Sequence, residues 1–441
     1  MKLIETIRNI WKIEDLKSRI ITTLGLVLVY RLGSFIVLPG IDPTQLSALE
    51  QQTSEGVMGL LNMFSGGAFA NASIFGLGIM PYISASIVIQ LLGIAVPYFQ
   101  RLQREGESGR RKINQITRYL TVIILVFQAP AYLANLPAEA VTAPGWMFKV
   151  SSIIILTAGT MFVMWLGERI TEKGIGNGIS LIIMVGIIAR LPFAAAAEFV
   201  SRFNEGGGLV MLLIEMVVLF FVFAGTILLV QGTRRIPVQY AKRIVGNKQY
   251  GGVRQYIPLK VNAAGVMPII FAQAIMFVPI VLVGYAESEA ATGFAAAFSD
   301  MTGWLYNSVF ALLIISFTYF YTAITINPTQ MAEDMKRNGG FIPGIKPGKK
   351  TIEFLDSVMS KITLPGSVFL ALVAILPAFA MIAGVDRMFA QFYGGTSLLI
   401  LVGVVLDTLQ QIESHLLMRH YDGLMKSGRI KGRTGGGPAV Y

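Results

Sequence analysis

The residue types that perform catalysis or hold metals are scarce in this chain. Its 441 residues include no cysteine and only two histidines, His415 and His420, which lie close together near the C-terminus. This composition excludes disulfides, thiolate chemistry and a site built from several histidines. The sequence also lacks HExxH, GxSxG and paired aspartates, which would indicate a metalloprotease, a serine hydrolase or carboxylate catalysis. We therefore expect no enzyme activity, no metal and no cofactor.

Ionisable residues inside the apolar stretches are few as well. Arg31 and Glu215 are the main candidates, and Arg190 lies near the end of a stretch. Ion-coupled transporters usually carry such groups at membrane depth. A secondary transporter of a small solute stays open as an alternative, but it requires a polar site at mid-membrane. A membrane-bound enzyme acting on lipids is a second alternative, and it requires reactive residues that we do not find.

The composition places the chain in the membrane. It is 54% hydrophobic and only 14% charged, whereas soluble domains are about a quarter charged. Ten stretches approach the roughly 20 apolar residues that a spanning helix needs. They lie at about 20–38, 74–96, 119–136, 150–166, 179–197, 209–230, 261–283, 303–326, 362–382 and 388–406. The expected fold class is an all-α polytopic membrane protein with ten transmembrane helices.

The basic residues predict how these spans are oriented. Almost all of the 36 Lys and Arg residues lie in the two terminal segments and in alternate loops. Cytoplasmic loops are enriched in Lys and Arg, so both termini should be cytoplasmic. The N-terminal segment 1–19 has the spacing of an amphipathic helix lying on the membrane surface, and 411–441 is a basic tail. The cytoplasmic loops would be those near 97–118, 167–178, 231–260 and 327–361.

The loops 231–260 and 327–361 are longer than a helical connection needs. Both mix Lys and Arg with Gly, Pro and aromatic residues, and the whole chain has a net charge of +11. They indicate docking of a large acidic or RNA-bearing partner. Membrane topology alone is the other explanation for the charges of the short loops. Because no nucleic-acid motif is present, we expect no sequence-specific binding to RNA or DNA.

Two further sequence patterns concern the part of the chain inside the membrane. The run at about 57–72 is too short to span the membrane and contains a glycine pair, which indicates a half-helix or re-entrant segment. Span five starts with GIGNGISLIIM and span ten with GGTSLLILV, each ending a half of five spans. The halves would be residues 20–205 and 206–410, inverted relative to one another as in many transport proteins.

Several strings in unbroken order give the chain a resemblance to a known family. They include NMFSGGA (62–68), GIMPYISASIVIQLL (78–92), GTMFVMWLGERITEKGIGNGIS (159–180), INPTQMAEDMKRNGGFIPGIKPGKKT (326–351) and GGTSLLI (394–400). From about residue 18 to residue 425 the sequence resembles the SecY family, the channel subunits of protein translocases. The resemblance implies ten helices in two inverted halves around a central pore. It also implies that unfolded polypeptides cross through the pore and that apolar segments leave it sideways into lipid.

The resemblance assigns roles to particular residues. The apolar pore ring would comprise Ile79, Ile83, Ile179, Ile183, Ile270 and Ile400. Such a ring offers no ligands to ions and favours dewetting when it is empty. The plug, a removable stopper, would include Asn62, Met63, Phe64, Ser65, Gly66 and Gly67.

The same resemblance predicts a lateral gate and docking residues. The gate would lie between spans two and three on one side and seven and eight on the other, with Gln90 and Gln128 facing it. The partner-binding residues would be Arg234, Arg235, Lys242, Arg243 and Lys346, the last standing where the family typically has arginine. Expected partners are SecE, SecG, the SecA motor or the ribosome, a translocating polypeptide with its signal sequence, and lipids of the bacterial cytoplasmic (inner) membrane.

Overall fold

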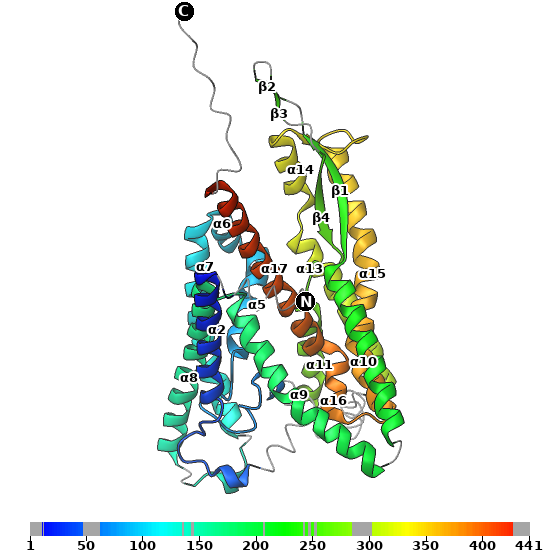
Figure 1. Cartoon of the computed structure of the whole chain (residues 1–441). Helices are drawn as coiled ribbons and strands as arrows, with labels where there is room; N and C mark the ends of the chain where they lie inside the picture. Colours follow the sequence, from blue (N-terminus) through cyan, green and yellow to red (C-terminus); the bar gives the residue numbers. More distant parts are fainter. Residues whose placement is uncertain are drawn as a thin grey trace, which may run out of the picture.

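The chain folds into long helices, with a small sheet protruding at one end (Figure 1). The computed structural model describes residue 11 and residues 13–46, 62–134, 136–142, 145–205, 208–240, 243–245, 248–250, 254–284 and 302–426. Most of the predicted surface helix at the N-terminus and the end of the basic tail lie outside the described residues.

The described part of the chain contains ten helices of 16 residues or more, one for each predicted apolar stretch. They are α2 (Glu14–Gly33), α5 (Met80–Ala95), α7 (Glu107–Ala134), α8 (Trp146–Lys173), α9 (Gly178–Glu205), α10 (Gly208–Gln231), α11 (Met267–Gly284), α13 (Trp304–Thr325), α15 (Lys349–Ile382) and α17 (Gly395–Lys426). The shorter helices are α6 (Pro97–Arg104), α14 (Pro328–Arg337), α16 (Arg387–Ala390) and the 3₁₀ turns η1 (Pro43–Gln45), η2 (Ala138–Ala140) and η3 (Gln391–Tyr393).

Length and composition make this a multi-pass membrane protein. Among the described helices, seven are long and apolar enough to cross a membrane, or eight if the bent pair α5 and α6 is one span. α2 is less apolar because Glu14 and Asp15 lie in its first turn and Arg31 in its last. α5 has only 16 residues. The ten predicted spans are consistent with these helices.

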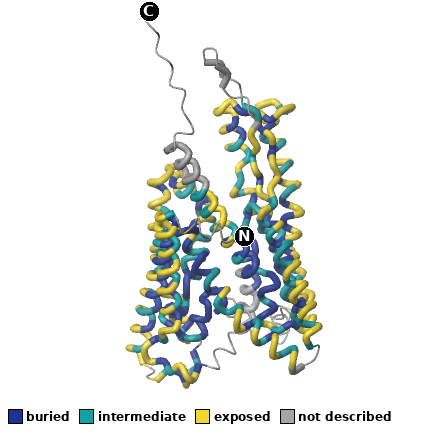
Figure 2. The backbone as a smooth tube through the Cα atoms, in the orientation of Figure 1, coloured by how far each residue is buried: buried dark blue, intermediate teal, exposed yellow. Residues whose placement is uncertain are grey.

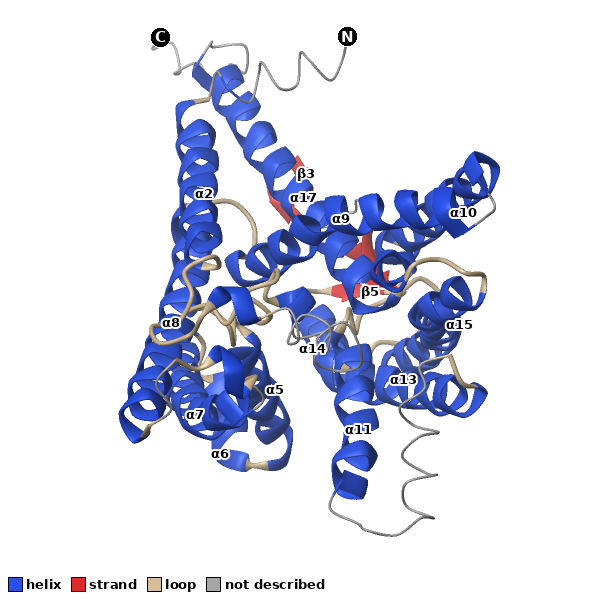
Figure 3. Ribbon diagram, turned by 90° about the horizontal axis from the view of Figure 1, so that it is seen from below, coloured by secondary structure: helices blue, strands red, loops and turns tan. Residues whose placement is uncertain are grey.

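The helices form two groups (Figures 1 and 3). One group contains α2, α5, α6, α7 and α8, and the other contains α10, α11, α13 and α15. α9 contacts α2 and α8 of the first group and α10 of the second, and it also packs on α17. α17 in turn contacts α10, α11 and α15. α9 and α17 therefore connect the two groups.

Three helices begin later than the apolar stretches predicted, and one of them is α11, which begins at Met267 rather than near residue 261. α5 begins at Met80 rather than near residue 74, because residues 65–79 form turns and Pro81 stands in the first helical turn. α17 begins at Gly395 and continues to Lys426, well past the predicted end at 406. Gly395 has a φ of 68°, a left-handed conformation that glycine adopts without strain. Residues 388–393 belong instead to α16 and η3.

The two long basic loops fold into one protrusion, whose strands were not predicted from the sequence. The strands are β1 (Thr233–Tyr240), β2 (Arg243–Val245), β3 (Lys248–Tyr250), β4 (Arg254–Lys260) and β5 (Gly340–Phe341). β4 and β5 both pair antiparallel with β1, so the two loops share a sheet, while β2 and β3 pair with each other. Ile236 and Val238 of β1 pack with Leu355 and Met359 of α15. This small core gives the protrusion a fixed shape.

Large apolar side chains cover much of the outer surface. Leu24, Phe127, Phe220 and Leu228 are examples, and α10 has little of its length buried. Figure 2 shows the buried segments toward the inside of each group and the exposed segments around the outside. Soluble proteins rarely expose such contiguous apolar surface, whereas lipid tails accommodate it. Each group therefore has a buried interior and an apolar outer surface.

Candidate functional site

Five of the six predicted ring residues meet in one apolar cluster, which we call the central cluster. Ile79, Ile183 and Ile400 are buried members of it, and Ile83 and Ile179 pack against it half-buried. They come from α9, α17, α5 and the residue preceding α5. The central cluster therefore joins segments that are far apart in the sequence.

The sixth ring residue has a different setting. Ile270 lies on α11 and is half-buried, and its neighbour Ile269 belongs to a second apolar cluster around α11, α13 and α15. Val266, one turn before Ile270, packs against both clusters. None of the six ring residues is exposed. Their role as a ring stays a prediction.

The predicted plug residues lie against the same cluster. Every residue from 62 to 70 is buried, and Met63 and Phe64 belong to the central cluster with Ile79 and Ile183. Residues 57–61 of the predicted plug lie outside the described residues. A short buried segment thus packs directly on the residues predicted to form the ring.

The plug segment carries its own network of hydrogen bonds. The Asn62 side-chain oxygen accepts a bond from the Ala70 backbone N–H at 3.1 Å. The Ser65 hydroxyl donates to the Asn62 carbonyl and accepts from the Phe69 N–H, both at 3.1 Å. Gly66 and Gly67 have φ values of 65° and 92°, which only glycine adopts readily. Polar groups of this segment, which would be costly to expose to lipid, are therefore hydrogen-bonded within the protein.

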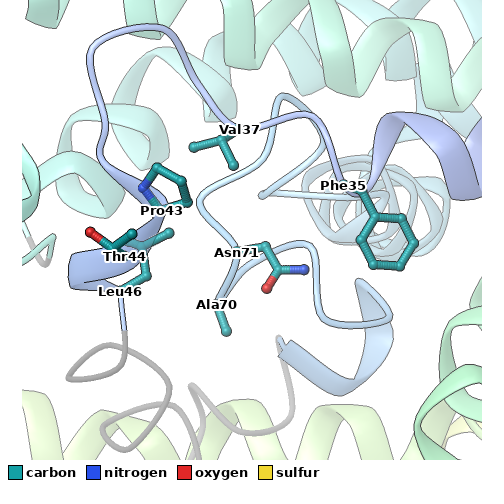
Figure 4. Close-up of a pocket in the computed structure, with 7 residues that line it drawn as sticks. All are labelled: Phe35, Val37, Pro43, Thr44, Leu46, Ala70 and Asn71. Carbon is teal, nitrogen blue, oxygen red and sulfur yellow. The ribbon is translucent and has the colours of Figure 1, made fainter.

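A pocket of about 420 Å³ lies beside the last plug residues (Figure 4). Its lining includes Ala70 and Asn71 on one segment and Pro43 and Thr44 on another. Asp42 holds the second segment in a turn, because its carboxylate accepts bonds from the Thr44 backbone and hydroxyl. These bonds lower the pKa of Asp42 below its ordinary value. The pocket brings open space close to Ala70, at the end of the plug segment.

A hydrogen bond joins the two helix groups where the lateral gate is predicted. The Tyr321 hydroxyl on α13 donates to the Gln90 side-chain oxygen on α5 at 3.1 Å. α5 contacts α7 within the first group, and α13 contacts α11 within the second. Gln128 is exposed on α7. Tyr321 was not singled out from the sequence, because a single tyrosine in an apolar span carries no distinguishing pattern.

The predicted docking residues that the structure describes lie on the protrusion. Arg234 and Arg235 are exposed on β1, and Lys346 is exposed on the turn between β5 and α15. Arg243 begins β2, but its side chain is not described, and Lys242 lies outside the described residues. The pairing of β5 with β1 holds the two basic loops together. The sequence predicted the loops as docking elements but not their union in one sheet.

Glu215, the acidic residue noted within a span, belongs to a buried ionic cluster. Arg202 of α9 pairs with Glu215 of α10 and, at 2.8 Å, with Glu198 one turn earlier on its own helix. Glu198 also accepts a bond from the Asp386 backbone N–H at 2.6 Å. Tyr393 donates its hydroxyl to the Glu215 backbone carbonyl at 2.9 Å. These contacts join α9 to α10 and to the segment before α17, which is a structural role.

Known proteins resemble the chain over most of its length. The family model for SecY matches residues 73–409. The protein translocase subunit SecY of Chlamydia trachomatis is 42% identical, with 97% of this chain and 99% of that protein covered. The protein of the same name from Halalkalibacterium halodurans is 44% identical, with 96% of this chain and 100% of that protein covered.

Solved structures share the fold at low sequence identity. One, described as a protein-conducting channel, has a TM-score of 0.57 and 18% identity, with 94% of this chain and 95% of that chain covered. A second, described as a SecY channel whose plug domain stabilises the closed state, has a TM-score of 0.61 at 18% identity and the same coverage. Canine Sec61 in a ribosome–channel complex has a TM-score of 0.55 at 17% identity, again with the same coverage.

Proposed function

Because the chain belongs to the SecY family, we propose that it conducts unfolded polypeptides through the central cluster, between its two helix groups. The observation that carries the proposal is the meeting of ring and plug residues in one buried apolar cluster. Branched apolar side chains offer ions no replacement for their hydration shells, yet can yield around a passing chain. In the resting channel, Met63 and Phe64 occupy the position against the ring that a translocating polypeptide would take.

Apolar segments leave the channel sideways between α5 and α7 on one side and α11 and α13 on the other. The Tyr321–Gln90 bond closes this seam. Hydrogen bonds between membrane helices contribute about 1 kcal/mol each. A bond of that strength holds the gate shut at rest and yields to an apolar signal sequence, which gains more by entering lipid. Gln128 on α7 is the second polar residue of the proposed gate.

The protrusion docks the partners that deliver the polypeptide. Arg234, Arg235, Lys242, Arg243 and Lys346 present positive charge to an acidic surface of the SecA motor or to the ribosome. SecE and SecG complete the channel in the bacterial cytoplasmic (inner) membrane. Both termini and the protrusion face the cytoplasm, in accordance with the distribution of Lys and Arg. The segments 20–205 and 206–410 form two inverted halves, with residues 57–72 as the plug.

Export from proteoliposomes tests this proposal. Vesicles containing the chain with SecE, SecG and SecA should import an unfolded substrate with a signal sequence when ATP is added. The paired substitution Arg243→Glu and Lys346→Glu should lower the rate about tenfold, because it places acidic groups against an acidic partner. Protection of the substrate from added protease measures transport.

A charge reversal elsewhere controls for this experiment. Lys149 is exposed in the first turn of α8, at the end of the helix that the proposed topology places on the opposite membrane face. Lys149→Glu should leave the export rate unchanged. A normal rate in the paired variant argues against docking on the protrusion. Uptake of a small solute without polypeptide transport would instead identify a secondary transporter.

A further inference from the structure

Two adjacent residues of α2 hold the plug segment from one side. The Tyr30 hydroxyl donates to the Ser65 carbonyl at 3.1 Å, and the Arg31 guanidinium donates to the next carbonyl, that of Gly66, at 3.0 Å. We propose that Tyr30 and Arg31 are the catch that keeps the plug seated and sets how readily it leaves. The inference rests on the proposed function of residues 57–72 as a plug.

The plug also makes a close backbone contact with α9. A Cβ at Gly66 would lie 2.8 Å from the Gly186 Cα, and one at Gly186 would lie 2.8 Å from the Phe64 carbonyl oxygen. The plug therefore contacts both α2 and α9, and Met63 and Phe64 also pack with Ile183 of α9 in the central cluster. Directional bonds to the plug come from Tyr30 and Arg31, and from Tyr132 of α7, which donates to the Phe69 carbonyl at 2.7 Å.

Packing contacts hold the side chains of Tyr30 and Arg31 in place. The Tyr30 ring is 1% exposed and stacks on Phe75, with 6.1 Å between ring centroids. A side chain at Gly33 would overlap the Phe75 ring, so α2 packs directly on the segment that follows the plug. The Arg31 guanidinium lies 5.2 Å from the centre of the Phe35 ring. These contacts fix both donors while the carbonyls that they bind belong to the plug.

A charged donor explains why an arginine occurs this far along an apolar span. Hydrogen bonds from charged groups contribute about twice as much as neutral ones. Since both acceptors are backbone carbonyls, the catch is independent of the plug's side chains. When the plug leaves, Ser65 and Gly66 exchange these donors for water. The donors thus stabilise the seated position without making it permanent.

The test uses a cysteine placed at the end of the plug. The chain has no native cysteine, and Ala70 is 4% exposed and lines the pocket beside the plug. In the full channel complex, the cysteine of Ala70→Cys should react slowly with a membrane-impermeant maleimide. The maleimide is added on the side of the membrane to which the pocket opens. Arg31→Met should raise the labelling rate about tenfold, and Tyr30→Phe about threefold, because each removes one donor. Resting ion conductance in planar bilayers should rise in the same order.

Two controls separate the catch from other effects. Arg19→Met removes a guanidinium from the same helix that donates to the Gly174 carbonyl, and it should change neither readout. In a channel lacking residues 60–70, Arg31→Met should cause no further rise in conductance, because its effect acts through the plug. An equal rise with and without the plug would overturn the proposal and indicate that Arg31 acts on ions directly.

The outcomes distinguish the catch from the plug itself. If deletion of residues 60–70 raises conductance but labelling in Arg31→Met and Tyr30→Phe stays at the parent level, the catch is refuted and the plug stands. If labelling rises in both variants but the deletion leaves conductance unchanged, the catch stands and the sealing role of the plug fails. Tyr30→Phe preserves the stacked ring, so a null result there is not attributable to misfolding.

Discussion

Four glycine substitutions in the ring should raise the ion conductance of the resting channel about tenfold or more. The substituted residues, one from each of four helices, are Ile83, Ile183, Ile270 and Ile400. Ions cross an apolar constriction poorly because they lose hydration there and gain no polar contacts. Removing four branched side chains widens the opening and admits water. Conductance in planar bilayers measures the change, while export of a loosely folded polypeptide should continue.

The matched control uses isoleucines on the outer surface of two of the same helices. Ile188 on α9 and Ile275 on α11 are exposed, so Ile188→Gly and Ile275→Gly carry the same helix-propensity cost without touching the central cluster. Their conductance should equal that of the unmodified channel. A ring variant that is as tight as the control would contradict the assignment of the ring.

Loss of Arg202 should destabilise the folded protein by about 3–5 kcal/mol. Arg202→Met keeps the length of the side chain but leaves the Glu198 and Glu215 carboxylates buried without a positive charge. Both are at most 5% exposed, so water cannot replace the guanidinium. The midpoint of thermal unfolding in detergent, followed by tryptophan fluorescence at one fixed heating rate, should fall by several degrees.

An exposed ion pair provides the comparison for Arg202. Arg169 pairs with Glu172 on the surface of α8 at 3.0 Å, and Arg169→Met should change stability by less than about 1 kcal/mol. The triple replacement Glu198→Gln, Arg202→Met and Glu215→Gln should recover most of the loss, because it removes the buried charges together. If Arg202→Met unfolds at the same temperature as Arg169→Met, the buried cluster does not stabilise the fold.

The helical architecture could be predicted from the sequence because each span is a predominantly apolar run of about the required length. Each of the ten long helices overlaps its predicted stretch. The starts of α5, α11 and α17 were less accurate, since hydropathy does not distinguish an apolar turn from a helix. The sheet of the protrusion was not predicted, because β1 pairs with β5, a strand in another loop about 100 residues later in the sequence. Such pairing depends on tertiary contacts that a local pattern does not contain.

The candidate site, too, could be predicted from the sequence only in part. The ring and plug positions came from family resemblance, since an isoleucine in a span is otherwise ordinary packing. The partners Tyr321 and Tyr30 were missed because their acceptors, Gln90 and the Ser65 carbonyl, lie far away in the sequence. Glu215 and Arg31 were noted as unusual charges, but their roles became clear only from their contacts with Arg202 and Gly66. Side chains that act across helices are visible only in the folded chain.

Photocrosslinking of an arrested polypeptide tests most directly whether chains pass through the central cluster. A photoreactive residue is placed at Ile83, Ile183 or Ile400 and, for comparison, at Ile154 or Ile382, which are 62% and 65% exposed. A substrate stalled in mid-translocation should crosslink at all three ring positions and at neither outer position. Crosslinks confined to the outer positions, or equal at both sets, would contradict a route through the ring.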